Sequence, residues 1–204
     1  MLPQNIGTMK WDGKIPFKHT EKLSIKRSDD FDEDCLAPQW QWNYQPRKDY
    51  FSLTERPGWL RLKAYRPLET NNLLKAGNTL TQRTFRKQNN DVTIKMDISN
   101  MQDGQKNGLC HFSSQHSAIG IVKEEDACYL EYRKNGNITK GIQIHSEFIW
   151  FRTEWGMDGK SQYYYSLDGD NFLPFGEKYQ LTWGNYRGDR IGTVSYTHLT
   201  LPTT

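Results

Sequence analysis

The chain has 204 residues, of which 35% are hydrophobic, 13% aromatic and 25% charged, and its formal net charge is +3. This length suits one domain with tails, and the small net charge with scattered basic residues argues against nucleic acid as a partner. No apolar run of about 18 residues occurs, so the sequence predicts no membrane-spanning segment. Its three cysteines form no CxxC pair and show neither a disulfide framework nor zinc-site spacing.

Residues 1–27 are basic, carry Pro3 and Pro16, and show no sustained hydrophobic pattern, so we interpret them as a linker or tail. The segment PQWQWNYQP at residues 38–46 follows. In a strand, Trp40 and Trp42 share one face. The two rings predict either a core contact, which we favour, or a platform for stacking a sugar.

Strand and turn patterns continue along the chain, and helical periodicity is nearly absent. Alternating apolar residues predict half-buried strands at residues 58–65 and 91–98, and short apolar runs predict two more at 109–112 and 117–122. Turn signals stand at Asn135-Gly136, Asp158-Gly159 and Asp168-Gly169. Short strands separated by such turns indicate an all-β sandwich or jelly roll.

Several motifs occur in a fixed order: WQWNYQP, YFSLTERPGWLRL, NTLTQR, YYYSLDGDNFLPFG and LTWGNYRGDRIG. In this order they resemble the C-terminal domain of glycoside hydrolase family 43 β-xylosidases and α-L-arabinofuranosidases. The resemblance covers residues 28–193. It implies an all-β, concanavalin A-like antiparallel β-sandwich that follows a five-bladed catalytic β-propeller, and the segment MKWDGK (9–14) looks like the chain leaving that propeller.

The catalytic groups of the family lie on the propeller: an acid Glu, a base Asp and an Asp that adjusts a pKa. An inverting glycosidase needs its acid and base on opposite sides of the glycosidic bond. The acidic residues of this chain crowd instead into one short segment, residues 29–34, which reads as a solvated loop. We therefore assign no catalytic residue here.

The C-terminal residues 194–204, VSYTHLTLPTT, depart from the family, which continues with a strand of alternating aromatic and acidic residues. They resemble the translation of a transposase adapter used in sequencing libraries. We expect the natural gene to differ after Thr193, the last strand of the sandwich to be missing, and Met1 to be an internal or false start. The compartment of the parent protein, which we expect to be bacterial, stays open: periplasmic, extracellular or cytoplasmic.

The resemblance also points to candidate site residues. Tyr186, with Asn185 and Arg187, occupies a loop that in some relatives extends toward the active site of the propeller. Trp40, Trp42 and Trp59 are candidate sugar-facing or core aromatics. The polar motif residues, which we expect to brace loops and satisfy backbone groups, are Glu55, Arg56, Arg61, Asn78, Gln82 and Arg83.

No metal site is predicted with any strength. Concanavalin A-like sandwiches often hold calcium through oxygen ligands, and Asp29 and Asp30 are the weak candidates. The five histidines form no ligand set. No other cofactor is expected.

The favoured function is a non-catalytic accessory domain of a family 43 hydrolase that acts on xylan or arabinoxylan. It would buttress the propeller, its expected partner, and help to close the pocket that binds a hemicellulose oligosaccharide. The alternative is a free-standing lectin-like carbohydrate-binding module, which the aromatic content favours. A third reading, an unrelated interaction sandwich, does not account for the ordered motifs.

Overall fold

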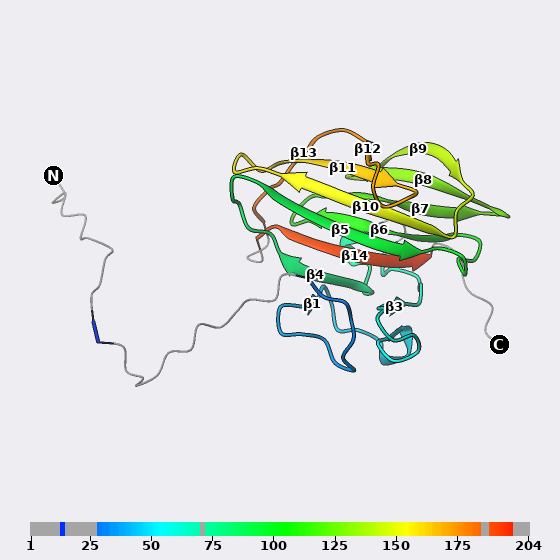
Figure 1. The fold of residues 1–204 in the computed structure, drawn as a ribbon, viewed down its shortest axis with the longest axis horizontal. Helices are drawn as coiled ribbons and strands as arrows, with labels where there is room; N and C mark the ends of the chain where they lie inside the picture. Colours follow the sequence, from blue (N-terminus) through cyan, green and yellow to red (C-terminus); the bar gives the residue numbers. More distant parts are fainter. Residues whose placement is uncertain (1–12, 15–27, 70–71, 185–187, 198–204) are drawn as a thin grey trace.

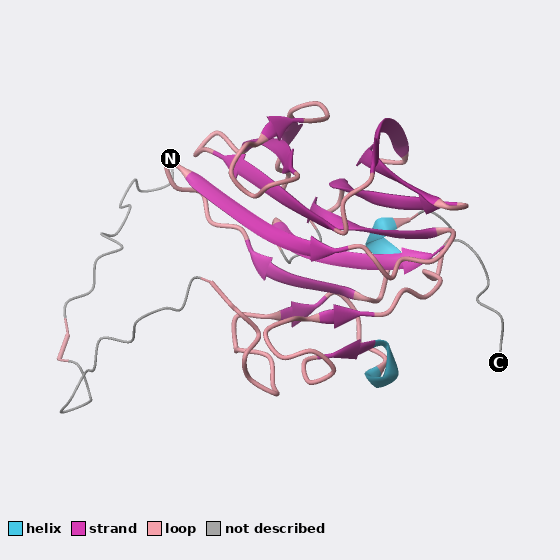
Figure 2. Cartoon of the chain, turned by 45° about the vertical axis from the view of Figure 1, so that its right-hand side comes forward, coloured by secondary structure: helices cyan, strands magenta, loops and turns pink. Residues whose placement is uncertain are grey.

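The protein folds into two packed β-sheets flanked by a short N-terminal layer (Figures 1 and 2). The computed structural model describes residues 13–14, 28–69, 72–184 and 188–197. No helix within these ranges is long and apolar enough to cross a membrane. The N-terminal layer comprises β1 (Gln41–Trp42), η1 (Lys48–Tyr50), β2 (Phe51–Ser52), β3 (Arg61–Leu62) and η2 (Leu73–Lys75). The first long strands are β4 (Thr79–Arg83) and β5 (Asn90–Asp97).

The remaining strands complete both sheets. They are β6 (Gln105–Phe112), β7 (His116–Glu124), β8 (Ala127–Lys134), β9 (Asn137–Ile144), β10 (Phe148–Trp155), β11 (Lys160–Ser166), β12 (Leu173–Pro174), β13 (Tyr179–Gln180) and β14 (Arg190–Thr197). One sheet has the order β1-β4-β14-β6-β7-β8-β9. The other has the order β12-β11-β10-β5, with β13 also on β11, and β2 and β3 form a separate pair. The neighbouring strands of these sheets pair antiparallel, so the all-β sandwich prediction is confirmed.

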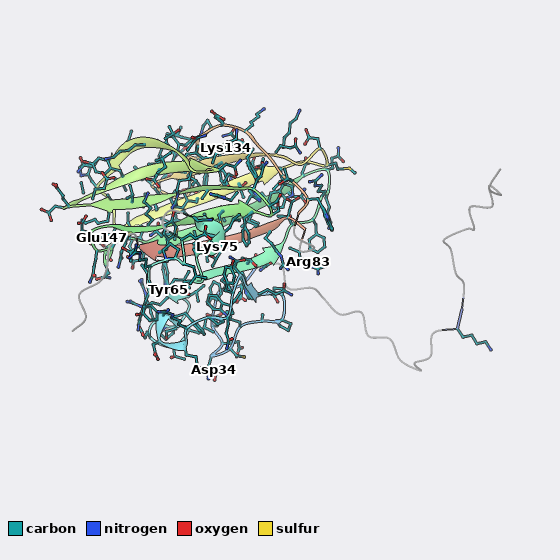
Figure 3. The ribbon with its side chains drawn as sticks, turned by 180° about the vertical axis from the view of Figure 1, so that it is seen from behind. Asp34, Tyr65, Lys75, Arg83, Lys134 and Glu147 are labelled. Atoms are coloured by element: carbon teal, nitrogen blue, oxygen red, sulfur yellow. The ribbon has the colours of Figure 1, made fainter. Side chains whose placement is uncertain are left out.

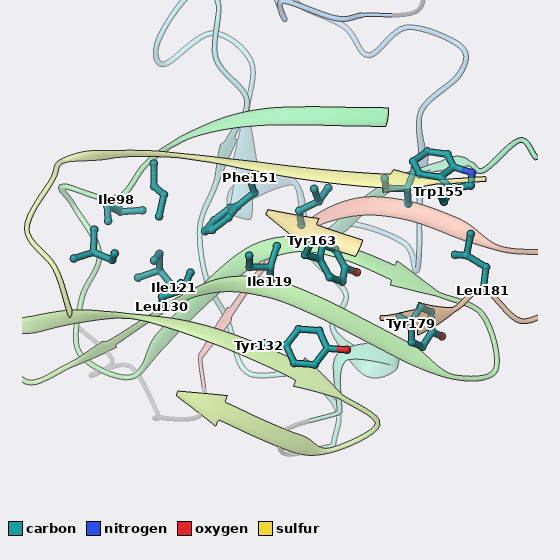
Figure 4. Packing of buried hydrophobic residues seen from close by; sticks show 14 residues of the cluster. Ile98, Ile119, Ile121, Leu130, Tyr132, Phe151, Trp155, Tyr163, Tyr179 and Leu181 are labelled. Carbon is teal, nitrogen blue, oxygen red and sulfur yellow. The ribbon is translucent and has the colours of Figure 1, made fainter. Parts of the chain in front are cut away.

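The core lies between the two sheets, where apolar side chains from both inner faces interdigitate (Figure 4). Ile119 and Ile121 of β7 meet Phe151 of β10 and Tyr163 of β11, and all four are fully buried. The alternation of apolar and polar residues in the sequence produces this arrangement, because successive strand residues point to opposite faces. The pattern at residues 91–98 behaves as predicted, since Val92, Ile94 and Met96 pack against the core.

The hairpin between β8 and β9 forms at Asn135 and Gly136, as the sequence predicted. Their φ angles are 49° and 89°. Both values lie in the left-handed region that a two-residue hairpin turn of the primed type requires, and Asn and Gly tolerate this region best.

Two boundaries differ from the sequence analysis. Residues 58–65 were expected to form one strand, but only Arg61–Leu62 form a strand, which pairs with β2, while Tyr65 makes an isolated parallel bridge to Tyr196. The sandwich was expected to end at Thr193, whereas β14 continues through Thr197, paired with β6 along its whole length and with β4 up to Val194. Val194 and Tyr196 are buried there, because an alternating Val-Ser-Tyr-Thr segment has the β propensity and the period that a central strand needs.

Candidate functional site

A cavity with a volume of about 1330 Å³ lies between the N-terminal layer and the sandwich. We call it the slot. One wall is residues 58–64 around β3, the other is residues 91–97 of β5, and the floor includes Ile191, Thr193 and Ser195 of β14. Aromatic, apolar and charged groups are mixed along its walls.

Trp40 and Trp59 both line the slot, although 18 residues separate them in the chain. Trp40 stacks on Phe31 with ring centroids 5.5 Å apart, and its indole Nε1 donates to Asp29 Oδ2 at 2.6 Å. Trp42 packs on Phe51 instead, at 4.7 Å. All three tryptophans are half-buried, and none belongs to the buried clusters of the sandwich. Trp40 and Trp42 thus have separate partners and do not form one continuous platform.

A strap of residues 55–59 crosses from the N-terminal layer to the outer face of β5. Arg56 forms an ion pair with Asp97, and its guanidinium carbon lies 4.1 Å from the ring centroid of Trp59. Lys95 Nζ lies 5.7 Å from the Trp59 ring and 4.6 Å from the Phe148 ring. Burial would raise the pKa of Asp97, but hydrogen bonds from Ser99 and Arg56 hold it below its ordinary value. The strap therefore fastens one end of the slot.

The other predicted polar motif residues have structural contacts. Arg61 Nε and Lys63 Nζ lie 3.1 Å and 2.6 Å from the two carboxylate oxygens of Glu55. The side-chain amide of Asn78 donates to the backbone oxygens of Tyr50 and Lys63, at 3.0 Å and 2.9 Å. These contacts brace the N-terminal layer.

Gln82 and Arg83 are the last two residues of strand β4, and their side chains have different surroundings. Gln82 lines the slot and is half-buried. Arg83 is exposed at the end of the sandwich where the loops before β5 and β14 lie (Figure 3). Neither residue is part of a shared binding cluster among the described side chains.

That end of the sandwich carries large exposed apolar side chains, which we call the loop end. Phe85, Met157 and Trp183 come from three different loops and expose 68%, 68% and 79% of their surface. Arg86 joins these loops, since it donates to the backbone oxygen of Leu181 at 2.9 Å and pairs with Asp189 at 3.0 Å. Tyr186, Asn185 and Arg187, which the sequence singled out, lie outside the described residues.

The carboxylate of Asp29, one of the two calcium candidates, already accepts hydrogen bonds from within the chain. Asp29 accepts from Trp40 and, through Oδ1, from the backbone N–H of Phe31 at 3.0 Å. Within the part of the chain that the structure describes, no three His, Cys, Asp or Glu side chains gather closely enough to hold a metal ion.

Two buried polar clusters were missed by sequence reasoning. His111 lies fully buried between the sheets, with Nε2 2.9 Å from Thr153 Oγ1 and its backbone N–H donating to Tyr163 Oη at 3.0 Å. Burial lowers its pKa to about 3. The hydroxyl of Tyr163 in turn donates to the backbone oxygen of Ser117 at 2.9 Å. This cluster links the two sheets through neutral groups.

The second cluster is ionic and lies within the seven-stranded sheet. Lys106 Nζ is 3.1 Å and Arg133 Nε is 3.2 Å from Glu131 Oε1, and these three side chains are nearly fully buried. Arg133 also donates to Tyr196 Oη at 2.5 Å. The partners come from β6, β8 and β14, so only the strand order brings them together. No local pattern in the sequence marks them.

The two antiparallel sheets, their order and the inward-facing aromatic and aliphatic core define a β-sandwich of the concanavalin A type. The model of the β-xylosidase C-terminal concanavalin A-like domain family matches residues 28–199. The chain belongs to this family.

Comparisons with individual proteins agree. The chain is 34% identical to a β-xylosidase of Formosa agariphila over 203 residues, which cover 90% of this chain and 34% of that protein. It is 29% identical to a putative β-xylosidase of Xylanibacter ruminicola, covering 89% and 33%. A bifunctional family 43 protein of Bacteroides eggerthii superposes with a TM-score of 0.76 at 27% identity, covering 85% of this chain and 24% of that one. The chain thus spans about a third of the length of its curated relatives.

Proposed function

We propose that this chain is the non-catalytic accessory domain of a family 43 glycoside hydrolase and that its loop end packs against the catalytic β-propeller of the full-length enzyme. By this proposal the full-length enzyme hydrolyses β-xylosidic or α-arabinofuranosidic bonds of hemicellulose. The acid and base that carry the reaction lie in the part outside this chain. The proposal rests on family membership and on the roughly one-third coverage of relatives described as β-xylosidases.

The observation that carries the packing proposal is the loop end. Phe85, Met157 and Trp183 are each at least 68% exposed and come from loops that Arg86 and Asp189 tie together. Clustered exposed apolar side chains mark surfaces that bind another protein surface. Burying them stabilises an interface by about 25 cal/mol per Å² of apolar surface.

The carboxyl groups of the described residues support a structural role. Burial raises the pKa of Asp189, the direction that a catalytic acid needs, but its carboxylate is paired with Arg86. Glu131 is enclosed between Lys106 and Arg133. These groups hold loops and strands together rather than facing a sugar.

The test uses the full-length enzyme with Phe85, Met157 and Trp183 all replaced by serine. Calorimetry of the unaltered enzyme should give one cooperative transition, and the triple variant should give two, because the domains lose their contact. Ile138→Ser with Ile142→Ser is the matched control, since these side chains are 50% and 51% exposed on β9, away from the loop end. A triple variant that unfolds as the unaltered enzyme does would refute the packing proposal.

The rival function, a free lectin-like module, is favoured by the aromatic slot lining of Trp40, Tyr50 and Trp59. It predicts that this chain alone binds xylo-oligosaccharides. Titration calorimetry with xylotetraose decides between the two, because an accessory domain should release no binding heat.

A further inference from the structure

A smaller pocket lies on the outer face of the seven-stranded sheet, and we call it the η2 pocket. Phe112 of β6 and Arg190 of β14 line it, together with Leu74 and Lys75 of η2. Phe112 packs with Leu73 of η2 in an apolar cluster that is separate from the core between the sheets. The volume of the pocket is about 300 Å³. Because this volume is at the lower limit for small-molecule sites, the pocket has room for one ring rather than for an oligosaccharide.

The η2 pocket is lined by two cations, and none of the described residues that line it is acidic. Arg190 is only 7% exposed, so water screens the charge of its guanidinium weakly. Lys75 is half-buried, and its Nζ lies 3.7 Å from the exposed carboxylate of Glu69. A hollow that is partly closed to water and lined by cations attracts anions.

The strand register places a further cation beside Arg190. On β14, Arg190 pairs directly with Phe112 of β6 on one side and with Arg83 of β4 on the other. Directly opposite residues of an antiparallel pair point to the same face, and like charges in such a pair are destabilising. Arg83 is exposed and lies outside the pocket lining, but its charge adds to that of Arg190. A bound anion would relieve the repulsion between the two guanidinium groups.

Hydrogen bonds hold the pocket in shape on both sides. The side-chain amide of Asn43 donates to the backbone oxygen of Leu74 at 2.9 Å and ties η2 to the segment after β1. Asn72 Oδ1 accepts from the backbone N–H of Leu74 at 3.1 Å and caps η2. On the opposite side, Ser113 Oγ lies 2.8 Å from Thr182 Oγ1. A pocket that is already ordered loses little conformational freedom when a ligand binds.

The lining residues match a carboxylate that is carried on a sugar ring. A guanidinium can bind a carboxylate through two parallel hydrogen bonds, and an ammonium adds a compact point charge. Tyr44, which is 36% exposed, offers an aromatic face and a hydroxyl to the ring of the ligand. Ser113 offers a further hydroxyl. A neutral sugar would not use the two cations, and a small carboxylate such as acetate would not use the aromatic face.

We propose that the η2 pocket binds one uronate unit, a sugar that carries a carboxylate, of an acidic hemicellulose. The carboxylate pairs with Arg190 and Lys75, and the sugar ring lies against Tyr44. The choice of hemicellulose as the source of this sugar rests on the proposed function. The pocket lining includes Gly184, which follows Trp183 of the loop end, so the bound unit lies beside the surface that is proposed to pack on the propeller. The site therefore anchors an acidic branch of the substrate next to the catalytic domain.

Titration of the 204-residue chain, followed through the NMR shifts of its backbone amides, tests the proposal. The probes are sodium glucuronate, glucose, which differs from it only at C6, sodium acetate and xylotetraose. Glucuronate should bind with a Kd on the order of 1 mM. It should bind at least about 10-fold more tightly than glucose, acetate or xylotetraose, because only glucuronate uses both the cations and the ring. The shifts should centre on residues 74–75, 112–113 and 190.

Three results overturn the proposal. They are no binding of glucuronate, an affinity for glucose or xylotetraose equal to that for glucuronate, and an affinity for acetate equal to that for glucuronate. The last result would show adventitious binding of a carboxylate only. The same titrations on the full-length enzyme, with its active site saturated by xylose and binding followed by calorimetry, should rank the probes in the same order. The result therefore does not depend on whether this chain folds alone.

Substitutions locate the binding site. Lys75→Gln removes one cation and should weaken glucuronate binding about 5-fold. Arg190→Lys keeps the charge but loses the planar fork, and should weaken binding about 10-fold. Lys134→Gln is the matched control, because Lys134 is similarly exposed and also pairs with a glutamate, Glu177, but lies outside the pocket lining. An equal Kd for Lys75→Gln and Lys134→Gln overturns the proposal.

This proposal and the proposed function can fail separately. The packing of the loop end is judged by the number of calorimetric transitions in the triple serine variant, which leaves every residue of the η2 pocket lining in place. Glucuronate binding together with a single transition in that variant would keep the uronate site and refute the packing. Two transitions without glucuronate binding would keep the packing and overturn the uronate site.

Discussion

The two halves of the sandwich are built differently. In the closed half, between β6–β8 and β10–β11, Ile119, Phe151 and Tyr163 are fully buried by contacts within this chain. In the open half, Ile94 and Met96 of β5 are only half-buried, and Thr193 on the slot floor remains partly exposed. The difference teaches that contacts among the described residues close one half of the sandwich and leave the other half partly solvated.

The largest effect is expected from the closed half. Phe151→Ala should lower the free energy of unfolding by about 3–5 kcal/mol, because it removes a ring that neighbours from both sheets enclose. Ile94→Ala, the open-half counterpart, should cost less than half as much, since Ile94 is already partly solvated. Urea unfolding of both variants measures the comparison. Equal losses would show that the two halves are packed alike.

A substitution in the ionic cluster of the seven-stranded sheet should lower the free energy of unfolding nearly as much as Phe151→Ala does. Glu131→Gln leaves the cations of Lys106 and Arg133 buried without a counter-charge, at a cost of about 3 kcal/mol. Glu124→Gln is the control, because the Glu124–Lys140 pair is exposed and should contribute less than about 1 kcal/mol. Chemical denaturation of the two variants should separate them clearly. A small loss for Glu131→Gln would mean that water reaches the cluster.

The buried His111 in the closed half makes the free energy of unfolding depend on pH. Burial lowers the pKa of His111 from its ordinary 6.5 to about 3, so the folded state keeps the ring neutral. Below pH 6.5 the unfolded chain binds a proton that the folded chain does not, and stability falls as the pH drops. The loss should reach about 2 kcal/mol between pH 6.5 and pH 5.

Denaturation at a series of pH values measures this slope. His145→Gln should leave it unchanged, because His145 is exposed on the loop after β9. His111→Gln should remove most of it, and a smaller slope should remain because burial and Arg133 also lower the pKa of His116. A slope that is unchanged in His111→Gln would assign the pH dependence to other groups.

The smallest effect is expected at the strap. Arg56→Ala removes the ion pair with Asp97 and the contact with Trp59, and should cost about 0.5–1 kcal/mol because the guanidinium is partly exposed. Proteolytic cleavage within residues 53–60 should accelerate. Arg152→Ala is the matched control, since Arg152 lies on the same outer face but contacts Thr93 and Phe172 instead of the strap. Equal cleavage of both variants would show that the strap does not depend on Arg56.

Local patterns in the sequence predicted the fold where a strand finds its partner within the chain. The alternation at residues 91–98 predicted β5, and Asn135-Gly136 predicted the β8–β9 hairpin. The alternation at residues 58–65 predicted a longer strand than β3, because only Arg61 and Leu62 pair with a neighbouring strand and Tyr65 makes a single isolated bridge to Tyr196. Periodicity predicts which residues can form a strand, whereas pairing depends on which edges are present.

The sequence predicted some of the residues that line the slot, but not how these residues are arranged in space. Trp40 and Trp59 were singled out as aromatic candidates, and both line the slot. That they share one cavity follows from the placement of the N-terminal layer beside β5, which no local pattern encodes. Glu131 and Lys106 were missed for the same reason, since 25 residues separate them and only the order β6-β7-β8 brings them together.

The most direct test of the whole account is to sequence the source DNA through both ends of this reading frame with adapter-free long reads. The account predicts that the frame continues upstream into a propeller with a catalytic Glu and two Asp residues. A frame that begins at Met1 would contradict the accessory function.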